Sequence, residues 1–512
     1  MTDPQTPNQE YFSGILLIKG QIYGCQKDKY RYLFQPFDKD QPPLLVYSKI
    51  NRTREPGQII CQVKKQEHKK KEKYQSGTLT IKIGSTSVRE DLLKGLVYHY
   101  SLQDLTKKIG QVEYSTPLIS EKSESLTDYV IGSGWCEKIV DHTDMDICSI
   151  DPPGCEDIDD AFCYQDGRLY IYIALVGDLY EQLNTFLDTR PFTFYFSQTT
   201  RFDMLGSETT SRRSLNVGQE RLALTLQLDL DNKSGEHHFY LARIVNKRQL
   251  TYDMVDKAYD KKDKYWTTLF KMTERLKDCI RQDVKMDSHG LIETFMILYN
   301  KLGISKIIEN AGNPVLRVHN MHSSEHQDSD SLVADPNPSD LAFLKFLGAE
   351  AATYQYTTNN HDDSKFHAGL GLTNYGHLTS PLRRAVDLYN QYYLLQSIFP
   401  VNKTTDLIRL DLNVINNRER SLKQYYRRTR LINISEKYSS PYVTTIIPYE
   451  VVDDETRYIY YCYWPKEQIR VKVAYLKTPE TVTRTDITLL QSLKVKLAIV
   501  FINGLPRVRV EI

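Results

Sequence analysis

The sequence predicts an α+β protein with several domains, in which a central region of mixed sheet and helices lies between two small β-barrels. Three observations predict this class. Five short strand-like segments occupy residues 11–83, strand-like segments return between residues 442 and 512, and the region between them combines strand patterns with long segments of helical apolar spacing. A chain of 512 residues is long enough for two to four such domains.

The composition is that of an ordinary soluble protein, with 40% hydrophobic and 26% charged residues. The net charge is +1, so any affinity for a polyanion must come from local patches. Residues 1–10 predict a disordered tail rather than a signal peptide, and no apolar run approaches the length of a membrane span. The eight cysteines are scattered without a Cys-x-x-Cys pair, which favours free thiols. Together these features indicate a cytoplasmic protein.

Residues 11–85 predict a barrel of the OB or cold-shock kind, because five strands are separated by glycine and proline breaks. The predicted strands are Ile15–Ile18, Tyr30–Phe34, Leu44–Val46, Gln58–Val63 and Leu79–Ile83. Tyrosines are interleaved with lysines here, an arrangement in which rings stack on bases and cations hold phosphates. This hypothesis names Tyr23, Tyr30, Tyr32 and Lys29 as nucleic-acid-binding residues. The alternative is a barrel with these rings in its core and the lysines in solvent.

Residues 86–140 predict a helix followed by a linker, with a contribution to a second barrel as the alternative. The apolar spacing from Val88 to Ile109 is helical, and its stripe is most simply part of a core. The polar segment Pro117–Thr127 is typical of a linker. The lysine-rich run Lys64–Lys73 is more typical of a solvated loop than of a nucleic-acid contact.

An unusually acidic segment follows, with aspartates at positions 151, 157, 159 and 160. Its flanks predict a loop between two strands, because the next residues predict a hairpin with a type I′ turn at Asp166-Gly167. Two unit charges about 4 Å apart repel by roughly 4 kcal/mol at an effective dielectric of 20. Several converging carboxylates must therefore take up protons or bind a cation.

Oxygen ligands of this kind suit Mg²⁺ best, with Mn²⁺ as the other choice. The spacing does not match an EF-hand loop, because Pro153 and Cys155 occupy ligand positions when the loop is counted from Asp151. The alternative is an acidic turn that is simply solvated.

The remainder of the central region alternates between strand and helix patterns. Strands are predicted at 221–229 and 239–245, and helices at 252–285 and 291–308. A polar loop is predicted at 321–338, followed by a helix at 341–352 with Ser339 as its cap.

A second group of polar residues lies in the segment Thr379–Leu388. Ser380 as N-cap and Pro381 at the first helical position predict the start of a helix. Arg383 and Arg384 would then lie in its first turn, where backbone N–H groups favour an anion such as a phosphate. The alternative is that Arg383 pairs with Asp387, an exposed pair worth about a few tenths of a kcal/mol.

The C-terminal part of the chain predicts a basic helix at 411–436, whose simplest function is an amphipathic brace with a solvated face. Residues 441–512 then predict a second small OB-type barrel. Its strands are expected at 443–446, 458–463, 469–473, 494–501 and 508–512.

Taken together, these motifs resemble those of the RNase II (RNB) family of processive 3′-to-5′ exoribonucleases. The resemblance covers residues 145 to 395 in the family's own order and is most specific at the four aspartates and at Thr379–Leu388. Between them lie Arg190-x-x-Thr193-x-Tyr195, Met204-Leu205, Ser214-Leu215, Leu250-Thr251-Tyr252, Glu293-x-x-Met296 through Asn300, and Arg317-x-His319.

The resemblance implies cold-shock-type barrels at the N-terminus, an RNB catalytic domain at 141–440 and an S1-like barrel at 441–512. The implied activity is hydrolysis of single-stranded RNA from its 3′ end to 5′-nucleoside monophosphates, with two Mg²⁺ ions bracketing the displacement. The implied metal ligands are Asp151, Asp157, Asp159 and Asp160. The implied catalytic residues are Asp159, Arg383 and Arg384, and the implied RNA-binding residues are Tyr195, Tyr252, Arg317 and His319.

The sequence departs from the family pattern at four positions. Leu175 replaces an aspartate, Gly206 a proline, Ala385 a tyrosine and Gln391 a histidine. None of these positions is an implied metal ligand, so the resemblance still implies activity. Two alternatives remain open: a non-catalytic RNA-binding protein with an RNB-like channel, and a DNase or endonuclease that uses the same metal chemistry. The complete set of aspartates together with Arg383 favours an enzyme over a binding protein.

Overall fold

The computed structural model divides the chain into two compact units, Met1–Asp104 with Glu419–Ile512, and Leu105–Arg418. It describes residues 10–50, 52–55, 57–67, 73–107, 139–230, 236–280, 287–319, 352–357, 365–367, 370–399, 409–438, 441–454, 456–467, 469–476, 489 and 491–511. The predicted linker at 117–127, the predicted loop at 321–338 and the predicted helix at 341–352, except the last residue of that helix, lie outside these residues.

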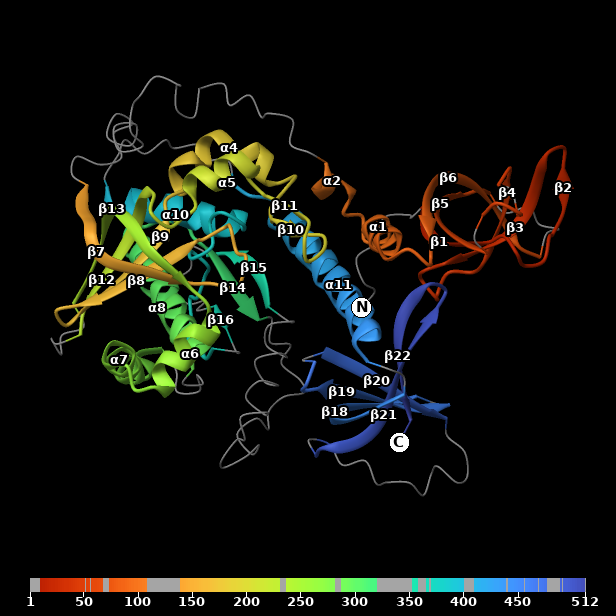
Figure 1. Cartoon of the computed structure of the whole chain (residues 1–512). Helices are drawn as coiled ribbons and strands as arrows, with labels where there is room; N and C mark the ends of the chain where they lie inside the picture. Colours follow the sequence, from red (N-terminus) through yellow and green to blue (C-terminus); the bar gives the residue numbers. More distant parts are fainter. Residues whose placement is uncertain are drawn as a thin grey trace. The chain divides into compact units, whose positions relative to one another are not determined.

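The N-terminal part of the first unit is a small β-barrel (Figure 1). Its strands are β1 (Tyr11–Leu17), β2 (Cys25–Gln26), β3 (Lys29–Pro36), β4 (Leu44–Ser48), β5 (Gln58–Lys65) and β6 (Gln75–Ser85). They are hydrogen-bonded in the order β1-β5-β6-β4-β3-β2, and β1 also pairs with β3, which closes five of the strands into a ring. The small N-terminal barrel that the sequence predicts is therefore present.

Two short helices follow the barrel, α1 (Arg89–His99) and α2 (Gln103–Thr106). The apolar spacing had predicted one helical stretch over this region. The helix is interrupted at Ser101, whose φ of 56° lies in the left-handed region.

The second unit is built on a closed barrel of five strands in the order β12-β13-β7-β8-β9. The strands are β7 (Val140–Ile150), β8 (Asp160–Gln165), β9 (Arg168–Ala174), β12 (Glu220–Asp229) and β13 (His237–Leu250). Strands β7 and β13 are parallel, and the other pairs are antiparallel. The predicted type I′ turn joins β8 to β9, with φ of 50° at Asp166 and 73° at Gly167.

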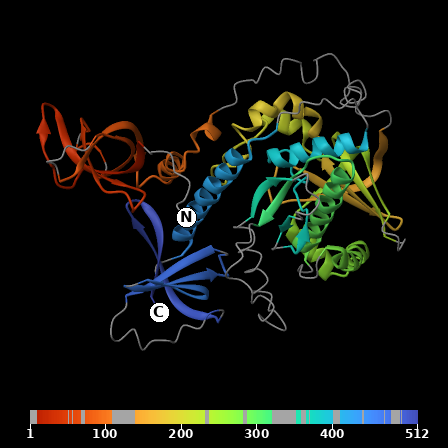
Figure 2. The same ribbon diagram turned by 180° about the vertical axis from the view of Figure 1, so that it is seen from behind.

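Helices pack against this barrel and share its apolar core. They include α6 (Tyr252–Asp260), α7 (Lys264–Ile280), α8 (Ser288–Glu309) and α10 (Ala385–Ile398). Helix α8 lies against the strands, where Tyr299 donates to the carbonyl of Leu224 at 3.1 Å, and Figure 2 shows α10 beside it. The predicted helix at 252–285 is divided into α6 and α7 at Lys262, which has a φ of 59°.

Shorter elements complete this unit. They are η1 (Gly177–Leu179), α4 (Tyr180–Leu187), α5 (Ser207–Arg213), β10 (Phe194–Tyr195), β11 (Arg201–Phe202), β14 (Val315–His319), β15 (Ala352–Tyr356), β16 (Phe366–His367) and β17 (Leu372–Thr373). The predicted basic helix is α11 (Leu412–Lys437).

The C-terminal part of the first unit is a five-stranded antiparallel sheet. Its strands are β18 (Tyr442–Asp454), β19 (Arg457–Trp464), β20 (Ile469–Leu476), β21 (Leu493–Ile502) and β22 (Leu505–Glu511). Each of the five overlaps a predicted strand, and they are hydrogen-bonded in the order β20-β19-β18-β21-β22. Among the described residues, however, no ladder joins β20 to β22, so this sheet lacks the hydrogen-bonded closure of the N-terminal barrel.

No helix in the described part of the chain is both long and apolar enough to cross a membrane. Cys25, Cys61, Cys148, Cys155, Cys163 and Cys462 are free thiols.

Candidate active site

The acidic loop lies where β7 ends and β8 begins, at one rim of the central barrel. Asp151 directly follows β7, and its backbone N–H donates to the carbonyl of Leu250 at 2.9 Å. Asp160 is the first residue of β8, opposite Ile173 of β9. Strand pairing therefore fixes both ends of the loop, and the side chains of Asp151, Asp157 and Asp159 are buried.

Asp159 is held by the segment that carries the second predicted motif, far away in the sequence. One carboxylate oxygen accepts the backbone N–H of Leu382 at 3.0 Å. The other accepts Nε–H of Arg383 at 2.8 Å. The two most specific motifs of the chain therefore meet through one ion pair, whose members lie 224 residues apart.

The electrostatics of the loop show an excess of negative charge. Burial raises the pKa of Asp159 to about 6, against the opposing influence of the Arg383 charge. Burial, followed by the charges of Asp151 and Asp159, raises the pKa of Asp160 to about 8. Burial also raises the pKa of Asp151. A cation placed among these carboxylates would relieve their mutual repulsion.

Asp157 is held by a short hairpin made of β10 and β11. Tyr195 of β10 donates its hydroxyl to Asp157 at 2.6 Å, and Arg201 of β11 donates Nη1–H to the other carboxylate oxygen at 3.0 Å. Tyr195 and Arg201 face each other in the strand register, so the hairpin presents both groups to one carboxylate.

Arg201 is a site residue that the sequence reasoning missed. Its guanidinium also contacts Asp203 at 2.8 Å and Glu156 at 3.1 Å, and so bridges three carboxylates. The only available signal was the Tyr195 motif itself, because a hairpin that returns after Tyr195 must place a residue near 201 across from it.

The arginine pair lies in a turn rather than in the first turn of a helix, so the predicted helix start was wrong. Helix α10 begins at Ala385, with Arg384 at its N-cap, and the N–H groups of Arg383 and Arg384 bond to the carbonyl of Ser380. Backbone contacts with a neighbouring segment explain this. Thr193 N–H donates to the carbonyl of Arg383, and a β-bridge joins Arg384 to Phe192. These bonds hold Arg383 in a turn and Arg384 in an extended conformation.

Arg383 pairs with Asp159 of the aspartate loop, whereas Arg384 pairs with Asp387. The Nη2–H of Arg384 donates to Asp387 at 2.7 Å, and the same carboxylate oxygen accepts the backbone N–H of Ser380 at 2.8 Å. One alternative from the sequence was that Arg383 pairs with Asp387. In the structure the partner of Asp387 is Arg384. Because the Asp387 side chain has no exposed surface, this is a buried pair rather than an exposed one.

We expect Arg384→Ala to destabilise the fold by about 3 kcal/mol or more, because it leaves the buried Asp387 carboxylate without its cation. Arg212→Ala is the matched control, since Arg212 and Glu208 form an exposed i,i+4 pair worth less than about 1 kcal/mol. Urea denaturation of both variants measures the difference. Equal stabilities would show that the Arg384–Asp387 pair contributes nothing to the fold.

Three further predicted residues lie in the same unit. Tyr252, the first residue of α6, stacks on His289 with ring centroids 3.7 Å apart. Burial raises its pKa to about 12, and the charges of Asp160 and Asp151 act in the same direction. Arg317 and His319 both come from β14. The Arg317 guanidinium lies 4.4 Å from the centre of the Tyr354 ring, and His319 packs edge-on against His367 at 4.5 Å.

The predicted residues of the N-terminal barrel belong to the other unit, and one of them is corrected. Tyr32 has no exposed surface and donates its hydroxyl to the carbonyl of Ile50, so its ring cannot stack on a base. Tyr30 and Lys29 are exposed, and Tyr23 is partly buried. The alternation of β3 explains the result, because Tyr32 points into the barrel and its neighbour Arg31 points out.

Two of the departures, Leu175 and Gln391, lie together at the end of β9. The Gln391 side chain accepts the N–H groups of Val176 and Gly177 at 2.7 and 2.6 Å, and donates to the carbonyl of Ala174 at 2.9 Å. Ala174 N–H in turn donates to the backbone carbonyl of Asp159 at 2.8 Å. Gln391 thus holds the end of β9, which holds the backbone of the aspartate loop.

The four carboxylates suit a hard divalent cation in their chemistry, but three of them are engaged by protein donors. Asp151 accepts Nε2–H of Gln249 at 3.4 Å. Asp157 and Asp159 accept hydrogen bonds from Tyr195, Arg201, Leu382 and Arg383, as given above. The Asp160 carboxylate accepts none from the described residues. Within that part of the chain, no three Asp, Glu, His or Cys side chains converge as a ready metal cage.

The fold and the site define a class of protein: one unit has a closed mixed barrel with a buried acidic rim that is faced by an arginine, and the other unit has a small β-barrel and a barrel-like sheet. The RNB domain family model matches residues 139–278 and 267–399, which together span just over half of the chain. The chain therefore belongs to the RNB domain family.

Comparisons with individual proteins agree with this family. The chain is 26% identical over 352 residues to Ribonuclease R of Ureaplasma parvum, covering 52% of this chain and 48% of that protein. It is 23% identical over 369 residues to Exoribonuclease 2 of Proteus mirabilis, covering 59% and 56%. It thus spans about half the length of the curated relatives that it matches.

Solved structures show the same fold. RNase R of Mycoplasma genitalium in complex with ribose-methylated single-stranded RNA superimposes with a TM-score of 0.68 at 15% identity, covering 98% of this chain and 89% of that one. Yeast Ssd1, described as a pseudonuclease, superimposes with a TM-score of 0.62 at 14% identity, covering 92% and 65%. The fold is therefore shared by proteins with and without nuclease activity, and only the site can distinguish them.

Proposed function

We propose that this chain is a 3′-to-5′ exoribonuclease that hydrolyses single-stranded RNA to 5′-nucleoside monophosphates. The observation that carries the proposal is the ion pair of Asp159 with Arg383 at the acidic rim of the barrel. A phosphodiester needs a positive group facing its non-bridging oxygens and an acidic group near the attacking water. The named relatives, which are ribonucleases, support RNA as the substrate.

The chain's own residues have distinct parts in the proposed reaction. Arg383 would exchange its bond with Asp159 for the scissile phosphate, whose charge grows as the water attacks, and it would stabilise that charge. Tyr195 is 38% exposed while its hydroxyl is fixed on Asp157, so its ring would stack on a nucleotide near the 3′ end. Arg201 would hold Asp157 in place. Arg384, paired with Asp387, would position the turn that carries Arg383.

We propose Mg²⁺ as the cofactor, held by Asp151, Asp157, Asp159 and Asp160. When bound, such ions supply a nucleophilic water and neutralise the developing charge on the leaving oxygen. Asp160 supports this assignment best. Burial raises the pKa of its carboxyl group, and the carboxylate accepts no hydrogen bond from the described residues. Binding at Asp157 and Asp159 would compete with their present contacts to Arg201 and Arg383.

Removal of divalent metal with EDTA is expected to abolish hydrolysis, and excess Mg²⁺ is expected to restore it. A second measurement does not depend on activity: saturating Mg²⁺ should raise the unfolding temperature, because a ligand at 100 times its Kd stabilises by about 2.7 kcal/mol. Asp160→Asn is the isosteric control and should lose this thermal shift. Full hydrolysis in EDTA would contradict the metal assignment.

The other candidate is a non-catalytic RNA-binding protein. Two observations favour it: the similarity to a pseudonuclease, and the engagement of Asp157 and Asp159 by protein donors. The presence of all four aspartates and Arg383 favours the enzyme, because a binding protein has no need of them.

One experiment separates these functions. The full chain is incubated with a 5′-labelled single-stranded RNA, its DNA copy and an RNA duplex, each with Mg²⁺ or with EDTA. An exoribonuclease gives a ladder or a short limit product from single-stranded RNA alone. An internal cut would indicate an endonuclease, cleavage of the DNA copy would indicate a less selective nuclease, and binding without cleavage would indicate the non-catalytic protein.

A further inference from the structure

One buried serine contacts the backbone of the aspartate loop on both sides of Asp157. The hydroxyl oxygen of Ser214 accepts the N–H of Ile158 at 2.9 Å, and the hydroxyl donates to the carbonyl of Glu156 at 2.9 Å. The next residue continues the contact, because the N–H of Leu215 donates to the carbonyl of Ile158 at 3.0 Å. Ser214 therefore holds the stretch of the loop around Asp157.

This stretch leads directly from one implied metal ligand to the next. Ile158 separates Asp157 from Asp159, and its side chain is buried. Side-chain donors, among them Arg201 and Arg383, hold the two carboxylates. Ser214 holds the backbone from which the carboxylates project. Two kinds of contact thus act on the same pair of aspartates, and the second kind comes from a residue with no other part in the site.

Ser214 is itself held in place by neighbouring elements. Its N–H donates to the carbonyl of Thr210 in the last turn of α5 at 2.8 Å, and its carbonyl accepts Nε–H of Arg221 of β12 at 2.9 Å. The preceding residue, Arg213, forms an ion pair with Asp178 at 2.9 Å, and both of these side chains are buried. Ser214 has no exposed surface, so its hydroxyl acts on the site through the loop rather than on a substrate.

The hydroxyl suits this place because it accepts and donates at the same time. It has one proton, and the Glu156 carbonyl at 2.9 Å is nearer than the other acceptor, Oδ1 of Asn216 at 3.2 Å. Without the hydroxyl, the buried N–H of Ile158 would lose this acceptor. A buried N–H without a partner is costly, so the loop would shift toward another partner.

We propose that Ser214 is a positioning residue that sets the affinity of the aspartate loop for Mg²⁺. This inference rests on the proposed function, which assigns Asp157 and Asp159 to the cation. Residues that orient metal ligands typically change metal affinity by about 10- to 100-fold when they are removed. Ser214 belongs to this kind because it fixes the backbone on both sides of Asp157 without supplying a ligand itself.

The test measures Mg²⁺ affinity from the unfolding temperature of the full chain as a function of Mg²⁺ concentration, without RNA. Ser214→Ala should weaken the affinity by about 10- to 100-fold, and Ser214→Thr, which keeps the hydroxyl, should restore most of it. Thr273→Val is the matched control, because it removes a buried hydroxyl that donates to the carbonyl of Leu269 in α7 at 2.9 Å. It should lower the unfolding temperature but leave the Mg²⁺ affinity unchanged.

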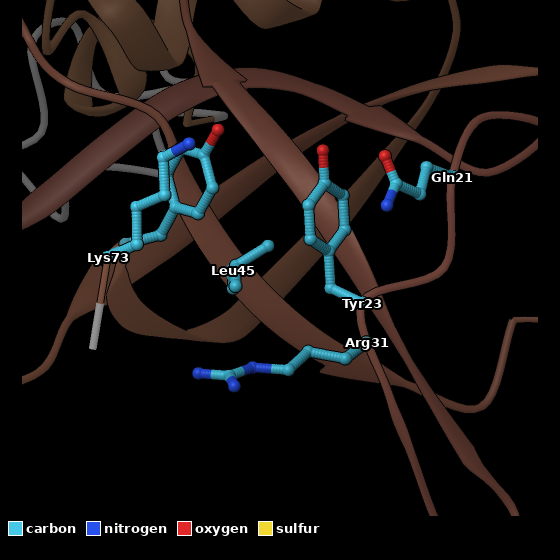
Figure 3. A pocket seen from close by; sticks show the side chains of 6 residues that line it. Gln21, Tyr23, Arg31, Leu45 and Lys73 are labelled. Atoms are coloured by element: carbon cyan, nitrogen blue, oxygen red, sulfur yellow. The ribbon is translucent and has the colours of Figure 1, made fainter. Parts of the chain in front are cut away.

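Binding of Mg²⁺ elsewhere on the chain must not be mistaken for binding at the loop. A pocket of about 400 Å³ in the N-terminal barrel offers no carboxylate to a cation (Figure 3). It is lined by Gln21, Tyr23, Arg31, Leu45, Lys73 and Tyr74. Weak binding at surface carboxylates is measured with Asp160→Asn, and the response of this variant is subtracted.

The rate of hydrolysis provides a second readout. Single-turnover cleavage of labelled RNA by Ser214→Ala should be slow at limiting Mg²⁺ and should recover at saturating Mg²⁺, because all of the reacting groups are still present. The Kd for RNA in EDTA should be unchanged. A loss of rate that is equal at every Mg²⁺ concentration would overturn the inference, because the effect would then lie in another step.

The results separate this inference from the proposed function. A full Mg²⁺ response in Asp160→Asn would contradict the metal assignment and the inference together. Loss of the response in Asp160→Asn with native affinity in Ser214→Ala would overturn the inference alone. If Ser214→Ala does not fold, Ser214→Cys decides the question, because a thiol has a similar shape but is a weak donor and acceptor. It should also weaken Mg²⁺ binding, and native affinity in this variant would overturn the inference.

Discussion

Asp159→Asn is expected to reduce hydrolysis of single-stranded RNA by about 10³-fold, the scale on which charged and polar groups at reacting centres act. The substitution keeps the size of the side chain but removes its charge. One of its two polar atoms must then become an NH₂ group facing Arg383 or the N–H of Leu382, which are both donors. The negative charge and the geometry of the turn are therefore disturbed together.

RNA binding should survive this change, because removal of a negative charge does not weaken attraction to a polyanion. Asp166→Asn is the matched control, since Asp166 lies in the β8–β9 turn at a positive φ that asparagine adopts readily. Single-turnover rates with 5′-labelled RNA, together with the Kd in EDTA, measure both quantities. An Asp159→Asn protein with full activity would remove Asp159 from the mechanism.

Arg383→Ala is expected to lower the cleavage rate by about 10² to 10³-fold while changing RNA affinity much less. The reason is that its contact with the phosphate strengthens as charge develops in the transition state, so its loss appears in kcat rather than in binding. Arg383 is suited to this because its side chain is 43% exposed although it is paired with a buried carboxylate. Guanidine added in solution should restore part of the rate.

Equal losses of affinity and rate would make Arg383 a binding residue only. Arg383→Lys is the informative companion, because it keeps the charge but loses the planar fork that can hold Asp159 and a phosphate at the same time. An intermediate rate is expected for this variant. Thermal unfolding of both variants provides the control for stability, since Asp159 loses its cationic partner in Arg383→Ala.

The departures from the family pattern bear on whether the site can work. The Gln391 side chain makes hydrogen bonds with three backbone groups at the end of β9. Leu175 is buried in the core of the barrel. Ala385 is the first residue of α10 and is also buried. Gln391 supports the strand that holds the aspartate loop, and none of the four aspartates is altered. The departures therefore concern the support of the site more than its reacting groups.

Much of the architecture could be predicted from local patterns in the sequence. Alternating apolar residues and the breaks between them predicted the N-terminal barrel. In the central barrel, the Asp166-Gly167 pair predicted the type of the turn between β8 and β9, because both residues tolerate positive φ. The same reasoning failed at Ser380, where a good capping sequence lies in a turn. Backbone bonds from residues 191–193 compete there with the helix, and no local pattern reports such a partner.

The sequence by itself determined which chemical groups this protein has: four aspartates at a strand end, an arginine pair, and tyrosines beside lysines in a small barrel. Only the tertiary structure decided which of them meet. Strand register turned Tyr32 inward and Arg31 outward and placed Arg201 across from Tyr195 at Asp157. The turn at Arg383, held by the backbone of residues 191–193, paired Arg383 with Asp159 and left Asp387 to Arg384. The physical reason is that local propensities fix the backbone over a few residues, whereas these contacts depend on how distant strands and turns pair.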